Sequence, residues 1–187
     1  MQRAAPKMID VTNEPQHVRD LYGSMCLLAR RMVVRGVRYV HLVNNGWDSH
    51  GQNKQWHEER TLSVDRPIVG LLTDLNRRGL LDNTLIVWAG EFGRVPIKQG
   101  VHGRDHHPYG FSAWMAGGGI RGGQIIGATD ELGFHTVEDT VHTNDLQATI
   151  LSLLGLDHKQ LPFFFEGRHR RLTDAGDEND LTERLMS

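Results

Sequence analysis

The chain has a single cysteine and no long apolar run. One cysteine, Cys26, excludes an internal disulfide framework and fits the apolar side of a helix. No uninterrupted apolar stretch approaches the roughly 20 residues of a membrane-spanning helix. The first ten residues, MQRAAPKMID, lack the apolar segment of an export signal. The sequence therefore predicts a soluble protein that has no membrane span and carries no address of its own.

The chain also has little net charge. Its 21 basic and 23 acidic side chains leave a formal charge of -2, which gives no general reason to expect nucleic acid as a partner. The one basic cluster, GRHRR at 167–171, is short and indicates a solvated loop, with a phosphate-binding patch as the alternative. No internal repeat or low-complexity segment is present. At 187 residues the chain can form one domain, or part of a larger one, with a real core.

Histidine is the residue that the chain has in excess, with eleven in 187 residues. Five histidines fall in two polar stretches that follow strand-like runs: His50, His57, His102, His106 and His107. Proteins that alternate strands and helices place their sites in such stretches. The distribution, more than the count, therefore indicates a functional site.

Apolar spacing predicts alternating helices and strands. Apolar residues at spacings of three and four predict helices over 14–34, 62–80 and 144–154. Pro67 suggests that the second helix proper begins near that residue, whereas His142 to Asn144 and Gly155 suggest the cap and the end of the third. Shorter apolar runs predict strands over 37–43, 84–90 and 111–118.

This order predicts an α/β fold with a mostly parallel sheet flanked by helices. Ligands of such sheets bind beyond the carboxyl ends of the strands, where GWDSH (46–50) and GEFGR (90–94) would lie. Residues 1–172 are predicted to belong to one domain. Residues 173–187 are polar and weakly patterned, and they predict a flexible tail.

The two polar stretches supply the chemistry of a divalent metal site. Asp48 and His50 lie two residues apart, so their side chains share one side of an extended chain and can hold one ion. The candidate ligands are Asp48, His50, Glu91, Asp105, His106 and His107. Any one of them alone is most simply a turn former or a hydrogen-bonded polar residue. Their clustering indicates a metal, zinc or manganese by the mixture of imidazole and carboxylate, with calcium or magnesium as alternatives.

Other polar residues of these stretches are candidates for contact with a substrate. Arg94 and Arg104 can bind a pair of phosphate or sulfate oxygens, or they are solvated arginines that pair with nearby carboxylates. Asn53 is expected to shape the pocket. Ser49 and Ser112 are the two hydroxyls to consider as nucleophiles, and neither has an activating base that the sequence identifies. The catalytic residue is therefore unassigned.

Several motifs resemble a known family. DNTLIVWAGEFGR (82–94) is similar to the DNTLIVFTSDHG pattern of sulfatases and other members of the alkaline phosphatase superfamily. A closer resemblance is to the sulfatase-like proteins grouped as domain of unknown function 1501. It rests on LLARR leading into GWDSH, GEFGR, GRDHHP, a glycine-rich stretch that ends in TDELG, and DLQATILSLLG. These motifs occur in order and cover roughly residues 15–170.

The resemblance implies an alkaline phosphatase-like fold with two metal ions. Asp48 and His50 resemble one Asp and His pair of the superfamily, at a tighter spacing. The other matched positions are Glu91, in place of an Asp-His pair whose histidine is replaced by Phe92, and His106 with Asp105 or His107 as the final histidine. The first aspartate and the nucleophile of the superfamily come from an earlier region. The chain therefore resembles the C-terminal portion, and its fold is expected to be incomplete at the N-terminus and to need the missing segment or a partner chain.

The implied activity is that of a metal-dependent hydrolase acting on phosphate or sulfate esters. Two alternatives stay open: a non-catalytic domain that binds metal or presents a binding surface, and a phosphomutase-like enzyme. Relatives are often exported, which implies a periplasmic or cell-surface location for a full-length protein.

Overall fold

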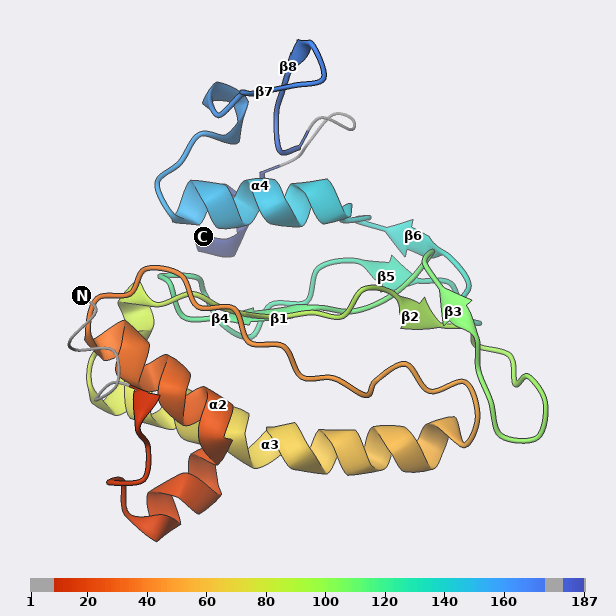
Figure 1. Ribbon diagram of the computed structural model, residues 1–187. Helices are drawn as coiled ribbons and strands as arrows, with labels where there is room; N and C mark the ends of the chain where they lie inside the picture. The colour runs from red at the N-terminus through yellow and green to blue at the C-terminus, as the bar shows by residue number, and fades with distance from the viewer. Residues whose placement is uncertain (1–8, 174–179, 187) are drawn as a thin grey trace. The chain divides into compact units, whose positions relative to one another are not determined.

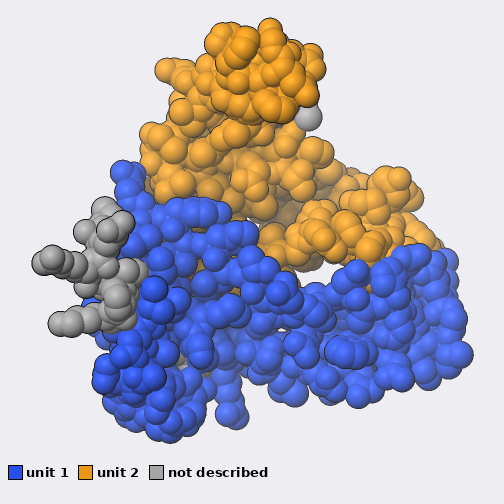
Figure 2. All heavy atoms as spheres, viewed as in Figure 1, with its two compact units in different colours: residues 1–80, 97–105 blue, residues 81–96, 106–187 orange. Residues whose placement is uncertain are grey.

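The computed structural model describes residues 9–173 and 180–186, which belong to two compact units (Figure 2). Unit 1 comprises residues 1–80 and 97–105. Unit 2 comprises residues 81–96 and 106–187. Among the described residues, no helix is both long enough and apolar enough to cross a lipid bilayer.

Two long helices form most of unit 1. Helix α2 spans Gln16–Val34, helix α3 spans Asn53–Arg77, and the two pack against each other (Figure 1). Their buried apolar side chains are Leu27 and Ala29 on α2 and Leu71 and Leu75 on α3. Each buried leucine stabilises the unit by roughly 2 kcal/mol, so this helix pair provides a stable base for the loops attached to it.

The helix predicted over 14–34 is confirmed, but α2 is interrupted at Gly23. This residue has φ 59° and ψ 162°, a backbone conformation that is essentially restricted to glycine. A side chain there would also lie 3.3 Å from Cγ of Pro67. The break in α2 therefore lies at the contact with α3, opposite its proline.

Helix α3 begins much earlier than the sequence predicted. Pro67 was expected near the start, because proline is favoured in the first helical turn, yet it lies inside the helix. The polar residues at 53–60 include lysine, glutamine, glutamate and arginine, which are all good helix formers without an apolar pattern. Their propensity extends the helix across the proline, which removes one backbone hydrogen bond.

The predicted buried strand at 37–43 is wrong. These residues form no strand, and Tyr39 is 72% and Val43 57% exposed. An apolar run of this length indicates an extended chain, but it does not identify a partner strand. The segment runs from α2 to the loop before α3 without joining a sheet.

The described residues of unit 2 form four small antiparallel sheets, each with two strands. The pairs are β1 (Ile86–Trp88) with β4 (Trp114–Ala116), β2 (Gly93–Arg94) with β3 (His106–His107), β5 (Ala128–Thr129) with β6 (Thr136–Glu138), and β7 (Phe163–Phe165) with β8 (Arg168–Arg170). In the first sheet, Ile86 pairs with Ala116 and Trp88 with Trp114. Short 3-10 turns span Leu81–Asn83 (η1) and His158–Gln160 (η2).

These sheets overturn the prediction of a mostly parallel, alkaline phosphatase-like sheet. The apolar runs at 84–90 and 111–118 do contain strands β1 and β4, but they pair antiparallel with each other. Every sheet within the described residues has two strands, whereas a parallel sheet needs helical crossovers and cover on both faces. The existence of β1 and β4 followed from apolar runs, but strand direction depends on long-range pairing that the local sequence does not encode.

Helix α4 spans Thr143–Leu153, and it confirms the helix predicted from the sequence. His142 Nδ1 accepts a hydrogen bond from Asn144 N, and Asp145 Oδ2 accepts one from His142 N at 2.7 Å. This reciprocal cap satisfies free amides of the first turn. The helix ends before Gly155, which has a φ of 77°.

The predicted tail, 173–187, contains helix α5 (Thr182–Met186). Leu185 of α5 is buried, and Arg121 N donates to Leu185 O at 2.7 Å. Thr173 is also buried. Residues 174–179 and 187 lie outside the described residues, so the prediction of a flexible tail stays a prediction there.

Candidate metal centre

The loop that carries Asp48 and His50 is fixed by hydrogen bonds of its neighbours. Ser49 N donates to Trp47 O at 2.9 Å, and Asn53 Nδ2 donates to Ser49 O at 3.2 Å. Ser49 is buried, whereas Asp48 and His50 on either side of it are exposed. The turn therefore directs the side chains of both candidate ligands outward from the start of α3.

A second loop of unit 1, residues 97–105, packs against the first. Gln99 and Gly103 exchange two backbone hydrogen bonds at 3.0 Å, and His102 O accepts from Asn53 N at 3.0 Å. This last bond satisfies an amide of the first turn of α3. Cβ of any other residue at 103 would lie 2.1 Å from His50 O, so only glycine allows this approach. The two loops thereby bring Asp105 to His50.

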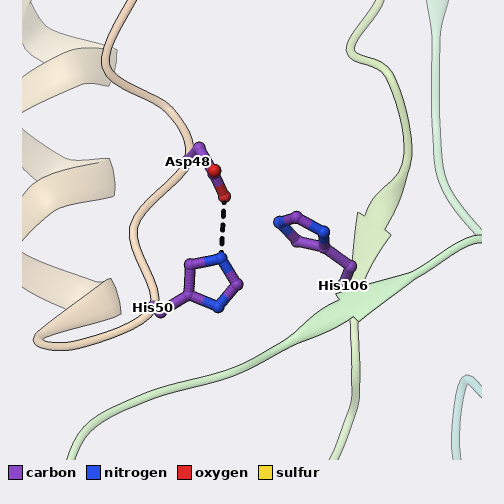
Figure 3. Close-up of side chains that lie close together, drawn as sticks. All are labelled: Asp48, His50 and His106. Carbon is purple, nitrogen blue, oxygen red and sulfur yellow. Dashed lines mark ion pairs between the residues drawn. The ribbon is translucent and has the colours of Figure 1, made fainter.

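His50 lies between two carboxylates, one facing each ring nitrogen. Its Nε2 is 3.1 Å from Asp48 Oδ1 (Figure 3). Its Nδ1 is 3.3 Å from Asp105 Oδ1. The side chain of His50 is 52% exposed, that of Asp48 60% and that of Asp105 55%. All three belong to unit 1. Exposed ion pairs contribute at most about 1 kcal/mol to stability, so the arrangement does little for the fold.

The chemistry of imidazole makes this arrangement suited to a cation. A neutral imidazole carries one N–H, so it donates to one carboxylate and turns a lone pair toward the other. The contact between this lone pair and a carboxylate is repulsive. It becomes attractive if the nitrogen gains a second proton or if a metal ion lies between the two groups. Metal-bound histidines usually donate their remaining N–H to a carboxylate, which fixes the ring. Asp105 is placed to accept that hydrogen bond, and Asp48 lies beside the other ring nitrogen.

The spacing of the two proposed ligand atoms fits one ion. Neighbouring ligands that each lie about 2.0–2.2 Å from a metal are roughly 3.0–3.5 Å apart in tetrahedral or octahedral geometry. Asp48 Oδ1 and His50 Nε2 are 3.1 Å apart. The same loop lines a shallow hollow of about 510 Å³, with walls formed by Gly46, Asp48, Ser49, His50, Gly51, Gln52 and Trp56. The hollow leaves room for water or a small anion beside the two candidate ligands.

Ser49 is not set up as a nucleophile. Its Oγ lies 3.3 Å from His57 Nδ1, but the same nitrogen lies 2.9 Å from Asn53 O. Because a carbonyl oxygen only accepts, Nδ1 must carry the proton and cannot remove one from Ser49. The contacts hold the loop in place, and Asn53 shares that role. Ser112, the other candidate, is exposed and lies outside the strands of unit 2.

The remaining predicted site residues lie in unit 2. Glu91 is exposed after β1, and Arg94 is half-buried on β2. His106 lies on β3 (Figure 3), with its ring centroid 4.2 Å from that of Phe92. His107 is buried, and its Nε2 donates to Phe134 O at 2.7 Å, so this nitrogen is engaged in the interior of unit 2.

Arg104 stays in unit 1, exposed, directly before Asp105. Sequence reasoning missed one contributor to the site. Trp56 lines the hollow, but the late helix start predicted at Pro67 left residue 56 without a position. Gly103, by contrast, is a sequence signal of close backbone approach, because this glycine directly precedes the charged residues of GRDH.

Comparisons with known proteins identify a family. The family described as "Protein of unknown function (DUF1501)" matches residues 1–185. No curated protein matches the chain, and no solved structure does.

Proposed function

The chain belongs to the DUF1501 family, and we propose that it binds a divalent metal ion through Asp48 and His50. The observation that carries this proposal is the position of His50, with one carboxylate at each ring nitrogen. Asp105 acts as the orienting partner that holds the Nδ1 proton, so Nε2 presents its lone pair beside Asp48. His106, which follows Asp105 in the chain, stays a ligand predicted from the sequence.

We further propose that the metal serves hydrolysis of a phosphate or sulfate ester. A bound divalent cation would supply Lewis acidity, polarising an oxygen of the ester. Arg104 is exposed next to Asp105, where its guanidinium can bind two oxygens of the same anion. The resemblance of 82–94 to the sulfatase pattern supports this class of substrate. The open hollow beside His50 gives a small anion access.

A non-catalytic metal site is the second candidate, and one observation favours it. The hydroxyl nearest to the proposed ion in the loop, that of Ser49, has no base to activate it, because His57 Nδ1 donates to Asn53 O. In this alternative the ion fixes the loops or presents a charged surface, and no ester is cleaved.

Metal binding is tested first, by calorimetric titration of the metal-stripped chain with zinc and with manganese. We expect one equivalent to bind in the parent, and His50→Ala to weaken binding at least 100-fold, because it removes a ligand outright. His17→Ala, an exposed histidine on α2, is the matched control and should bind as the parent does. Equal binding by the parent and His50→Ala would exclude this site.

Hydrolysis is tested separately on p-nitrophenyl phosphate and p-nitrophenyl sulfate with the metal-loaded chain. Release of nitrophenol that disappears in His50→Ala supports the hydrolase. Metal binding without release of nitrophenol from either ester supports the non-catalytic alternative.

A further inference from the structure

The hairpin of β7 and β8 has an unusual surface for so short an element. Its strands are joined by Glu166 and Gly167, which have φ values of 50° and 79°. Two central residues with positive φ define the turn type that matches the twist of a two-residue hairpin. The register pairs Phe163 with Arg170 and Phe165 with Arg168. Within unit 2 the hairpin projects beyond α4 (Figure 1).

The hairpin exposes apolar side chains on both faces. Alternation along a strand puts Phe163 and Phe165 on one face and Phe164 on the other. The three rings are 43%, 52% and 67% exposed respectively. Leu161 and Leu172, just outside the strands, are 36% and 61% exposed. A patch of five neighbouring apolar side chains is more than scattered surface residues and indicates an interaction site.

The same hairpin carries most of the local positive charge. Arg168, Arg170 and Arg171 stand against one acidic residue, Glu166, although the whole chain has a formal charge of -2. Arg170 pairs with Glu166 at 3.1 Å, and its guanidinium carbon lies 5.8 Å from the centre of the Phe165 ring. Because Arg168 and Arg170 share a face with Phe163 and Phe165, aromatic and cationic groups are interleaved. The basic cluster at 167–171 is thus largely a strand and not the solvated loop that the sequence suggested.

We propose that this hairpin docks on the surface of an anionic lipid bilayer. The phenylalanine rings and flanking leucines enter the boundary between headgroups and acyl chains, and the arginines bind lipid phosphates. Neither contribution is strong alone, but apolar insertion combined with a basic patch gives stable peripheral binding. Arginine suits the role because its planar guanidinium binds phosphate oxygens in pairs.

The distribution of apolar groups favours a bilayer over a single-stranded nucleic acid. Base stacking uses aromatic rings along one groove that follows the phosphate backbone. Here the rings occupy both faces, and the flanking leucines offer no stacking surface. A bilayer surrounds an inserted hairpin, so it can cover both faces at once.

The proposal is tested by co-sedimentation of the full chain with two kinds of vesicle. One kind is phosphatidylcholine alone. The other contains phosphatidylcholine and phosphatidylglycerol in a ratio of about two to one. We expect binding to the anionic vesicles and little to the neutral ones. Phe164→Ser should lower the ratio of bound to free protein about ten-fold. Arg168→Gln should lower the ratio of bound to free protein about five-fold. This effect should be smaller at high salt, because salt screens the attraction between arginine and lipid phosphate.

Matched variants separate a docking role from a structural one. Ile125→Ser removes an apolar side chain that is 92% exposed outside the hairpin, and Arg38→Gln removes an exposed arginine of unit 1; both should bind as the parent does. Phe164→Trp keeps an apolar ring and should retain binding even if Phe164→Ser proves unstable. Equal binding to both vesicles, no binding by the parent, or loss in the control variants would each overturn the proposal. So would binding of a single-stranded oligonucleotide, without vesicle binding, that the hairpin variants abolish.

Discussion

Asp105 orients the proposed metal ligand without being required to touch the ion. Its Oδ1 faces the Nδ1 of His50 at 3.3 Å, so Asp105→Asn keeps the shape but loses the negative charge that holds the proton. We expect metal affinity to fall about ten-fold, at the lower end for such partners, because the amide oxygen still accepts. The measurement is a zinc titration, with Asp65→Asn, an exposed aspartate of α3, as the control. If affinity instead falls as far as in His50→Ala, Asp105 is itself a ligand.

Gly103 permits the contact between the two loops of unit 1. A methyl group there would lie 2.1 Å from His50 O and 2.9 Å from Gln99 O, both backbone atoms. We expect Gly103→Ala to destabilise the chain by about 1–3 kcal/mol and to weaken metal binding, because the loop that carries Asp105 must move. Gly122→Ala is the matched control, since nothing lies within 4 Å of its added carbon and it lies outside the site. Thermal unfolding measures the loss of stability and zinc titration the loss of metal affinity. Equal stability and equal affinity in the two variants would contradict the prediction.

At the scale of elements, the break in α2 is set by one residue. Gly23 has φ 59° and ψ 162°, and its α-carbon faces the ring of Pro67 on α3. We predict that Gly23→Ala costs about 1–3 kcal/mol of unfolding free energy, through backbone strain and the contact with Pro67. Gly36→Ala, also at positive φ but with open space around it, isolates the backbone cost from the packing cost. Chemical denaturation measures both, and an equal loss would assign the effect to the backbone alone.

The helices were the most predictable elements. Helix α4 could be predicted with its cap, because His142, Asp145 and Gly155 are local signals. Helix α3 shows the limit of local signals. Pro67 predicted a helix start, but it lies in the interior of the helix. The strands β1 and β4 were predictable as extended segments only, because the partner of each comes from distant residues. The connection between them includes GEFGR (90–94) and GRDHHP (103–108).

At the scale of the whole molecule, acid is expected to destabilise the fold. Five described aspartates have a pKa below the ordinary value: Asp10, Asp130, Asp139, Asp157 and Asp180. For Asp130 the main cause is the hydrogen bond from Phe134 N at 2.9 Å, and for Asp139 it is the Arg184 side chain at 2.7 Å. A depressed pKa means that the folded state favours the charged form, so the stabilisation is complete above the unfolded pKa of about 3.9. It is lost as pH falls through the lower folded pKa.

Asp130→Asn tests this pH dependence. The variant should be less stable than the parent at neutral pH, and the difference should narrow as the pH falls below about 4. Melting temperatures from pH 7 down to about pH 2 give the two curves. Parallel curves over this range would show that the turn at 130–135 does not contribute to acid sensitivity.

Local sequence patterns were enough to predict the family, helices α2 and α4, the extended segments and the residues of the proposed metal site. These depend on local patterns, namely apolar spacing, capping residues and short motifs such as GWDSH and GRDH. Tertiary structure alone decided that the strands pair antiparallel, that 37–43 joins no sheet, and that Asp105 faces His50. The reason is that strand pairing and the contact between loops depend on interactions between residues far apart in the chain. No local pattern specifies the free energy of these interactions.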